Sequence, residues 1–522
     1  MIVMFLRYFF TLFLLTFQLM VLEGKQVILP AQFGLESAKN NVERYWSIYN
    51  AHRKALELGT TVSYRGIDSL EIEIPKDAKS IPIANEQDFS GLKLIVTNHS
   101  KDIYLFELKQ KSIPINVFAA NVDNGDFSSD SILKRGNYIL ILQDDNPWVE
   151  NRKGHNYGHI RKDILFLNDG KSVNLPIAPY NNFASKVSAK YCKVSRNRKL
   201  FANLVFHRKY GNSKIVNLLS VNTQNNFELR NVICYTPESS LVEDHIISIY
   251  NCTNIFFKDV KIYGTYSSKD HSGYGIELNN VWNCSFLRLY GTGNWGIFGT
   301  SNVSLATFEN CDINRFDIHC YGKNAHFIKC TFRDLYNQFA SMYGKVVFNN
   351  CKFIDFIPIG FGKSYNAYTS FDIVIRNCSF YSPTRNLCFL IKTTGIFDKE
   401  INKRPELIKK GWPNIYIDGL KIYSKGDVFG YFYLFNFGIR NIKYPIPSKM
   451  SIRNIHFFPE EDVNFKISSS FAYFGRKPYI EIIQKGFVFL LICILICLIF
   501  IIKRLFVTRE RINYQIQLFS NE

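Results

Sequence analysis

A recurring Asn-Cys dipeptide is the feature that most restricts how this chain of 522 residues can fold. The dipeptide occurs five times, and a Lys-Cys pair is a sixth, variant copy. The six copies begin at Asn251, Asn283, Asn310, Lys329, Asn350 and Asn377, with successive spacings of 32, 27, 19, 21 and 27 residues. A sequence that repeats at such intervals is typical of a solenoid, in which each repeat contacts only its neighbours.

The residues around each cysteine indicate a strand that follows a tight bend. Phenylalanine stands two residues after four of the cysteines, at Phe286, Phe332, Phe353 and Phe380. Side chains two residues apart point to the same face of a strand. Asparagine suits the bend before the strand, because it tolerates the left-handed backbone conformation and can bond its own backbone. Short strands at this period predict a coil of stacked parallel strands over residues 201–460.

The composition agrees with a mostly β fold. The chain has 46 Phe and 30 Tyr but only 5 Met and 5 Trp, and aromatic residues favour strands over helices. With 47% hydrophobic and 20% charged residues, it has enough apolar side chains for a large core. These fractions exclude a disordered or collagen-like chain.

Apolar segments at both ends predict export and attachment to a membrane. Residues 1–24 carry one early arginine and then fifteen uncharged residues, which suits a signal peptide, with an uncleaved anchor as the alternative. Residues 486–502 contain no charge and are just long enough to cross a bilayer as a helix. The basic tail, residues 503–522, is expected in the cytoplasm by the positive-inside rule. The body is therefore expected outside the cytoplasm, at the cell surface or in a periplasm.

The cysteines of the repeat have two possible states. If they occupy one register of the coil, they stack inside it as free thiols about 4.8 Å apart. In an exported chain they could instead pair as disulfides. We favour the stacked thiols, and we expect no metal site because no spacing typical of zinc ligands is present.

Asn-Cys-x-Phe rungs in an exported chain resemble the right-handed parallel β-helix proteins of the pectin lyase-like superfamily. The resemblance covers roughly half of the chain. It implies the fold and leaves the activity open, since the superfamily includes polysaccharide lyases, glycoside hydrolases, phage tailspikes and surface proteins without known catalysis. The chain lacks the Gly-His-Gly element of polygalacturonase-like hydrolases, and we find no acidic cluster like the calcium site of pectate lyases. Any cofactor is therefore unknown.

The expected fold is all-β, with a capping helix before the coil and a transmembrane helix after it. The capping region, residues 25–115, contains apolar side chains at helical spacing over residues 41–58, followed by a glycine that would end the helix. Such a helix would cover the open end of the coil, where strand edges invite pairing. Residues 116–200 are expected to be irregular β structure with a polar loop over residues 143–163. Residues 461–485 are expected to be a linker.

The candidate catalytic residues lie between Arg315 and Tyr321. Strand alternation predicts that Arg315, Asp317, His319 and Tyr321 share one exposed row, while the residues between them face the interior. β-Elimination from a uronate requires a cation, a base and an acid, which Arg315, His319 and Tyr321 could supply. Asp317 could orient His319 or act as one of two hydrolase carboxylates. The alternative is a solvated strand face whose charges pair across neighbouring rungs.

Candidate substrate-binding residues lie about one rung away on each side of this row. Trp295 and Tyr336 could stack on sugar rings, and Asn294 and Gln338 could form amide hydrogen bonds with hydroxyl groups. We expect these four residues to widen a groove around the candidate catalytic row.

The charge and the predicted location leave two functions open. The formal charge of +19 would attract an anionic polysaccharide or acidic lipid head groups, although a lysine-rich composition that only maintains solubility is an alternative. Nucleic acid is not an expected partner of an exported body. In the first function, a membrane-anchored β-helix binds a polysaccharide and cleaves it as a lyase or hydrolase, or binds without cleavage. In the second, a non-catalytic surface or envelope protein uses the coil as a rigid scaffold.

Overall fold

The computed structural model describes most of the chain between residues 27 and 483. The described ranges are 27–84, 86–149, 159–180, 186–209, 216–236, 245–264, 273–292, 296–333, 337–339, 342–354, 359–362, 371–381, 387–394, 413–423, 431–436, 449–458, 465–466 and 480–483. The predicted signal segment, membrane segment and tail all lie outside these ranges. Within them, no helix combines the length and the hydropathy that a membrane span requires.

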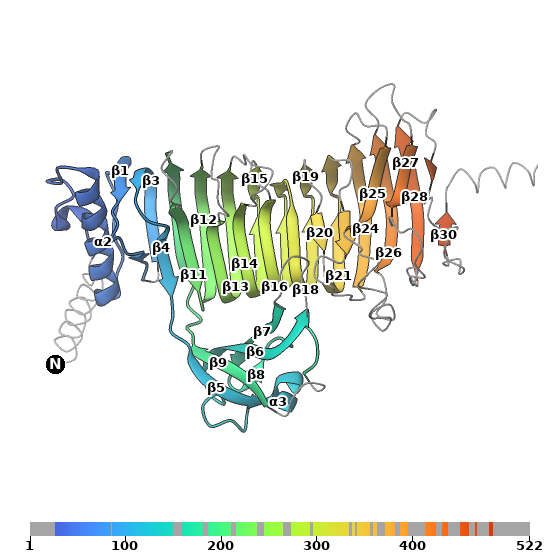
Figure 1. Cartoon of the computed structure of the whole chain (residues 1–522), viewed down its shortest axis with the longest axis horizontal. Coiled ribbons are helices and arrows are strands. Elements are labelled where there is room, and N and C mark those ends of the chain that lie inside the picture. Colours follow the sequence, from blue (N-terminus) through green and yellow to red (C-terminus); the bar gives the residue numbers. More distant parts are fainter. Residues whose placement is uncertain are drawn as a thin grey trace, which may run out of the picture.

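Most of the described residues form one long coil of parallel strands (Figure 1). The coil contains 25 of the described strands. Strand β13 (His245–Tyr263) pairs with β14 (Tyr274–Leu287), which pairs with β16 (Gly296–Glu309), and each pairing is parallel. Every strand therefore bonds to its equivalent in the next turn, which confirms the predicted parallel β-helix.

The remaining strands of the coil continue the same pattern on both sides of these three. They are β1 (Ser69–Ile74), β2 (Ile81–Pro82), β3 (Glu86–His99), β4 (Ile103–Lys109), β10 (Lys199–Arg208), β11 (Val216–Asn222), β12 (Asn225–Tyr235), β15 (Tyr290–Thr292), β17 (Asp312–Ile313), β18 (Phe316–Ile328), β19 (Thr331–Arg333), β20 (Asn337–Phe339), β21 (Met342–Asn349), β22 (Lys352–Ile354), β23 (Ile359–Gly362), β24 (Phe371–Tyr381), β25 (Leu387–Thr394), β26 (Asn414–Tyr423), β27 (Tyr431–Asn436), β28 (Met450–Phe458), β29 (Phe465–Lys466) and β30 (Ile480–Ile483).

Asparagines with left-handed backbone conformation form many bends of the coil, as the sequence predicts. Those that precede the repeat cysteines have φ between 50 and 58°. Their amide side chains also bond from one turn to the next. Asn283 Nδ2 donates to Asn254 Oδ1 at 2.6 Å, and Asn280 Nδ2 donates to Asn251 Oδ1 at 3.0 Å. Asparagine thus provides both the backbone conformation and a partner for its own amide.

The repeat cysteines are buried and unpaired, but they do not form the single ladder expected from the sequence. Four of them follow the same bend in successive turns: Cys311, Cys330, Cys351 and Cys378. Cys252 instead lies beside Val281, and Cys284 lies beside Ala306. The prediction of one register was wrong because left-handed Asn followed by a small inward residue fits several bends of each turn.

Stacked phenylalanines fill the interior beside these bends. The rings of successive turns lie 4.6 to 5.0 Å apart between centroids, close to the spacing of the strands. The column consists of Phe257, Phe286, Phe308, Phe327 and Phe348. Aromatic packing and strand pairing therefore impose the same repeat distance on the coil.

Helix α2 (Asn41–Leu58) covers the first end of the coil (Figure 1). It follows a short 3-10 helix, η1 (Pro30–Phe33). The side chain of Asn40 caps α2 by accepting a hydrogen bond from the backbone of Glu43, and Gly59 ends it with φ of 64°. Two of its own side chains, Tyr45 and Ile48, are fully buried. The helix therefore shields the apolar interior at the first turn.

A second, antiparallel sheet interrupts the coil between β4 and β10. Its strands have the order β5-β9-β6-β7-β8 and lie beside the coil (Figure 1). They are β5 (Ile113–Phe118), β6 (Asn137–Val149), β7 (His159–Asn168), β8 (Lys171–Ser172) and β9 (Lys186–Lys193), with helix α3 (Ala119–Asn124) between β5 and β6. We call this unit the inserted sheet.

The inserted sheet and the strands beside it correct one expectation from the sequence and decide between two others. A polar loop was expected over residues 143–163, but Gln143 pairs with Lys162 in an antiparallel ladder between β6 and β7. Continuous apolar runs, residues 138–142 in β6 and 164–167 in β7, pair with each other, and the ladder extends from them into the polar residues. The regular coil was expected from about residue 201, and the strands near residues 70–74, 92–97 and 104–108 were expected as either an N-terminal domain or its first irregular turns. The second alternative is confirmed, because β3 and β4 pair in parallel with β10 and β11.

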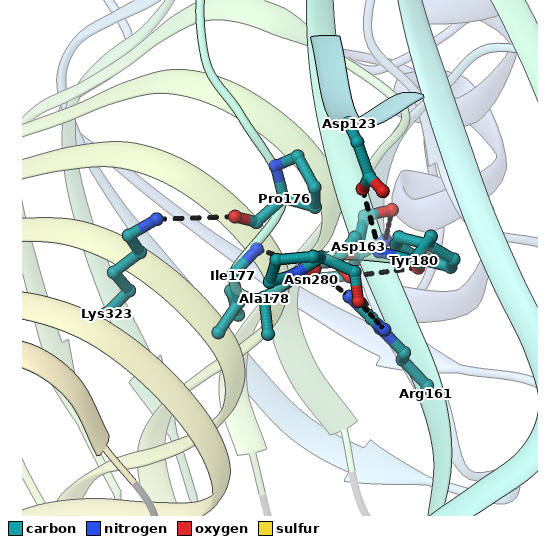
Figure 2. Close-up of polar contacts among 10 residues, drawn as sticks. Asp123, Arg161, Asp163, Pro176, Ile177, Ala178, Tyr180, Asn280 and Lys323 are labelled. Atoms are coloured by element: carbon teal, nitrogen blue, oxygen red, sulfur yellow. Dashed lines mark hydrogen bonds and ion pairs between the residues drawn. The ribbon is translucent and has the colours of Figure 1, made fainter. Parts of the chain in front are cut away.

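Polar contacts fix the inserted sheet against the coil (Figure 2). Asn280 Nδ2 of the coil donates to the carbonyl of Asp163 at 3.4 Å, and Lys323 Nζ donates to the carbonyl of Pro176 at 3.3 Å. Behind this contact, Arg161 and Asp163 form a buried ion pair at 3.1 Å. The guanidinium of Arg161 also lies 3.5 Å from the centre of the Tyr180 ring. The edge of the sheet that touches the coil is therefore rigidly held.

The buried cysteines lead to a test of their redox state. We expect thiol labelling of the chain, unfolded without reductant, to recover all eight described cysteines as free thiols, because none of them is paired. Peptide mapping after alkylation would identify each site. Disulfide-linked peptides that join Cys311 to Cys330, or Cys330 to Cys351, would contradict this structure.

The buried histidine of the cap predicts acid sensitivity. Burial lowers the pKa of His52 to about 3, and its Nε2 lies 2.8 Å from the hydroxyl of Tyr64. Below about pH 6.5 the unfolded chain binds a proton there that the folded chain does not, so stability falls by up to about 1.4 kcal/mol per pH unit. Urea unfolding between pH 7 and 5 should show this slope. His52→Gln should reduce it, and an identical slope in both proteins would contradict the assignment.

Candidate functional site

The candidate catalytic row lies at the start of β18, on the outer side of the coil. Phe316 and Ile318 face the interior and are buried, as the alternation predicts. Arg315 and Asp317 face outward, but their side chains are only 3% and 1% exposed. The expectation of a solvent-exposed row is therefore wrong for these two residues. The reason is that a tyrosine from two strands away, Tyr274 of β14, bonds to Asp317.

The centre of this site is a buried ion pair. Arg315 Nη2 lies 2.6 Å from Asp317 Oδ2, and the hydroxyl of Tyr274 donates to the same oxygen at 2.9 Å. Burial acts to raise the pKa of Asp317, but Arg315 and His319 act more strongly in the opposite direction. The pKa therefore lies below its ordinary value, and the Asp317 carboxylate is charged at neutral pH.

His319 is the most accessible member of the row. Its side chain is 27% exposed, and its Nε2 lies 2.7 Å from the hydroxyl of Tyr274 and 3.5 Å from Asp317 Oδ2. A hydroxyl group has one proton, so a tyrosine that donates to Asp317 must accept from His319. This arrangement assigns the proton of a neutral His319 to Nε2. The imidazole is thus oriented by two groups from different turns of the coil.

A β-bulge explains why simple alternation fails here. The register between β16 and β18 shifts so that Ile318 pairs with Thr300 and Cys320 with Ser301, which leaves His319 as an extra residue. Tyr321 then occupies a bend with φ of 42° and is only 4% exposed. It does not share an exposed row with His319. A left-handed backbone is unusual for a bulky side chain, and such residues often lie beside functional sites.

A glycine allows the tyrosine to lie against the coil. Gly299 of β16 stands between the strands that carry Tyr274 and Asp317. A Cβ atom at Gly299 would lie 2.6 Å from Cδ2 of the Tyr274 ring. Only glycine therefore leaves space for the ring in this position, from which its hydroxyl reaches Asp317.

Sequence reasoning missed a second carboxylate, Glu277, on the same outer side. In the strand register, Glu277 and Asp317 flank Gly299 from opposite sides. Glu277 Oε2 accepts hydrogen bonds from Ser248 Oγ at 2.9 Å and from the hydroxyl of Tyr250, and its side chain is 21% exposed. Glu277 and Asp317 share this side of the coil because of the number of residues in each turn. The sequence does not reveal that number, since the spacing of the repeats is irregular.

We call the five residues of this site the Asp317 cluster. They are Tyr274, Glu277, Arg315, Asp317 and His319. The stacked rings of His245 and Tyr274, 6.0 Å apart, extend the cluster toward β13. Together these groups offer two accessible imidazoles, His245 and His319, and one accessible carboxylate, Glu277, which lies 4.0 Å from His245 Nδ1.

Of the four predicted substrate-binding residues, the structure describes only one. Asn294, Trp295 and Tyr336 lie outside the described residues. The backbone of Gln338 pairs with Asp317 from the neighbouring strand β20, which places it beside the cluster in the register. Its role in binding stays a prediction. Across the described ranges, no three His, Cys, Asp or Glu side chains are grouped closely enough to hold a metal ion.

Comparisons with known proteins give a likeness in fold. No protein family model and no curated protein matches the chain. Among solved structures, the tailspike of Pseudomonas phage phi297 is 10% identical with a TM-score of 0.43, over 83% of this chain and 80% of the tailspike. The Streptococcus pneumoniae surface protein and adhesin PfbA is 10% identical with a TM-score of 0.40, over 88% of this chain and 100% of the adhesin.

A third solved structure is similar at the same level. The tailspike of Acinetobacter baumannii bacteriophage AP22, solved in complex with capsular saccharide, is 11% identical with a TM-score of 0.35, over 78% of this chain and 77% of the tailspike. These tailspikes and the adhesin are right-handed parallel β-helix proteins, which is the fold that the Asn-Cys rungs predict.

The contact between Gly299 and Tyr274 can be tested by adding one methyl group. Gly299→Ala should lower the free energy of unfolding by about 1 to 3 kcal/mol, the usual cost of overpacking, because the ring must move. Ser301→Ala on the same strand is the matched control and should change it by less than about 0.5 kcal/mol. Equal effects of the two substitutions in urea unfolding would contradict the packing described here.

Proposed function

We propose that the chain binds a polysaccharide along the side of its coil, at the Asp317 cluster. The observation that carries this proposal is the bonded set of Tyr274, His319 and Asp317, which presents an accessible imidazole on a rigid outer face. Recognition of sugar hydroxyl groups requires donors and acceptors held in fixed positions. The buried ion pair between Arg315 and Asp317 supplies this rigidity.

The shape of the coil supports an elongated ligand. Neighbouring strands stand about 4.8 Å apart, so Glu277 and Asp317, two strands apart, are separated by about 10 Å along the coil axis. A polymer that lies along this side would meet the exposed groups of both strands. A small compact ligand would meet only one of them.

Cleavage of the bound polysaccharide is a second candidate function, favoured by the hydrogen bond between His319 and Tyr274. Tyr274 and Asp317 orient the imidazole through Nε2, which leaves Nδ1 as the nitrogen that can accept a proton from a substrate. In this mechanism His319 is the catalytic residue and Asp317 is a positioning residue. Arg315 is buried and forms an ion pair with Asp317, so it does not fit the role of neutralising a substrate carboxylate.

The cellular location of this activity is part of the proposal. The apolar segment at residues 486–502, followed by four basic residues, supports a membrane anchor with a cytoplasmic tail. The apolar segment within residues 1–24 supports export of the coil. In this arrangement the Asp317 cluster would face polysaccharides outside the cytoplasm.

Binding and cleavage can be separated with one substitution and one panel of polysaccharides. The full-length chain would be offered acidic and neutral polysaccharides, with affinity, unsaturated uronate and reducing ends as readouts. His319→Ala should weaken binding by about tenfold, the effect of losing one hydrogen bond to the ligand. If His319 is also the acid or base, turnover should fall by a factor of about 100 or more.

The control for this experiment is His456→Ala, which removes an exposed histidine from β28 of the coil. It should leave both affinity and turnover unchanged, and neither variant should move the unfolding midpoint substantially. Binding without turnover of any polymer would leave the binding function alone. Failure of the chain to bind any polysaccharide, or binding that His319→Ala does not weaken, would overturn the proposal for the Asp317 cluster.

A further inference from the structure

A cleft separates the inserted sheet from the bends of the coil. Its volume is 610 Å³. One wall comes from the ends of β4 and β11 and from β13, and the other from β6, β7 and β9 of the inserted sheet. We call it the basic cleft, and its lining residues are Lys109, Gln110, Lys111, Ser112, Ile141, Gln143, Lys162, Ser188, Ala189, Lys190, Asn222, Thr223 and Asn251.

The charge in this cleft has one sign. The described lining contains four lysines, Lys109, Lys111, Lys162 and Lys190, and no carboxylate. Of these four lysines, only Lys109 forms an ion pair with another described residue: its Nζ lies 3.9 Å from Glu107 Oε1. A concave surface with low-dielectric walls concentrates the field of such charges and attracts anions.

The walls of the basic cleft are joined by hydrogen bonds. Gln110 Nε2 donates to the carbonyl of Lys193 at 2.6 Å, and Asn226 Nδ2 donates to the carbonyl of Arg196 at 2.7 Å. Both bonds connect the coil, or the segment that leaves it, to the segment that returns from the inserted sheet. The lysines from the two walls are therefore held around a preformed space.

The uncharged lining indicates which kind of anion fits. Seven of the lining residues carry amide or hydroxyl groups, which can bond the hydroxyl groups of a sugar. The described lining contains no aromatic residue, whereas binding of single-stranded nucleic acid relies on stacking of bases against aromatic rings. A sugar polymer that carries carboxylate or sulfate groups matches both the charge and the polar lining.

We infer that the basic cleft is a second binding site, which holds the charged groups of an acidic polysaccharide. None of its residues belongs to the Asp317 cluster, so the inference does not depend on that site. The two sites are also separate in space: Asn251 and Tyr321 lie in the same row of bends, but Asn280 and Asn302 between them are buried, and Asn280 bonds to Asp163 of the inserted sheet. Three steps of about 4.8 Å separate Asn251 from Tyr321 by about 14 Å.

The test compares two double substitutions that change the charge equally. Lys162→Glu with Lys190→Glu alters the basic cleft, and Lys352→Glu with Lys421→Glu alters two exposed lysines elsewhere on the coil. The full-length proteins would be titrated with polygalacturonate, dextran sulfate and neutral dextran at several salt concentrations. The cleft variant should bind the acidic polymers at least about tenfold more weakly, with a shallower salt dependence, because two counter-charges are reversed.

The control variant should lose less than about threefold in affinity, since its lysines lie outside the cleft. Neutral dextran should bind none of the proteins through this site. Equal losses in the two variants would mean that the net charge alone attracts the polymer, and would overturn the inference. Absence of binding to either acidic polymer by the unaltered chain would also overturn it. His319→Ala should not change the salt dependence, which separates failure of this site from failure of the Asp317 cluster.

Discussion

The backbone hydrogen bonds between successive turns are the interaction on which the rest of this structure depends. Each turn bonds to the turn before it and the turn after it, so every residue must keep its place in the register. Asparagines at the bends satisfy this requirement, because they adopt a left-handed backbone and bond to the asparagine of the adjacent turn. The interior must then offer side chains that stack at the same distance, as the phenylalanine column does.

The sequence predicts this architecture well because its physical causes are local. Asn before Cys, and Phe two residues later, report a bend and an inward face within four residues. The pattern does not indicate which bend of a turn the cysteine follows, since asparagine with a left-handed backbone occurs at several bends of each turn. For this reason the motif wrongly predicts Cys252 and Cys284 in line with Cys311, and for the first strands, which lack the motif, the sequence leaves open whether they form a separate domain or the first turns of the coil.

The candidate site was harder to predict because it depends on the length of each turn. Arg315, Asp317 and His319 were found from alternation, but their burial follows from Tyr274, which is 43 residues before Asp317. The bulge at His319 adds another residue that alternation cannot count. The need for glycine at position 299 becomes apparent only from the structure, in which the Tyr274 ring packs directly against it. The site therefore depends on which residues the strand register brings side by side, whereas the fold depends on the residue types at each bend.

The inserted sheet has a consequence for the order in which the chain folds. Strands β1 and β2 pair with β3 and β4 ahead of the inserted sheet, but Gln87 in β3 pairs with Phe201 in β10, so these first turns join the rest of the coil only across the inserted sheet. Later turns close over far shorter stretches of chain and pay less entropy to do so. The capped end, although it is synthesised first, can therefore join the longer part of the coil only when the inserted sheet has brought β10 back, so that sheet affects the order of assembly as well as forming a wall of the cleft.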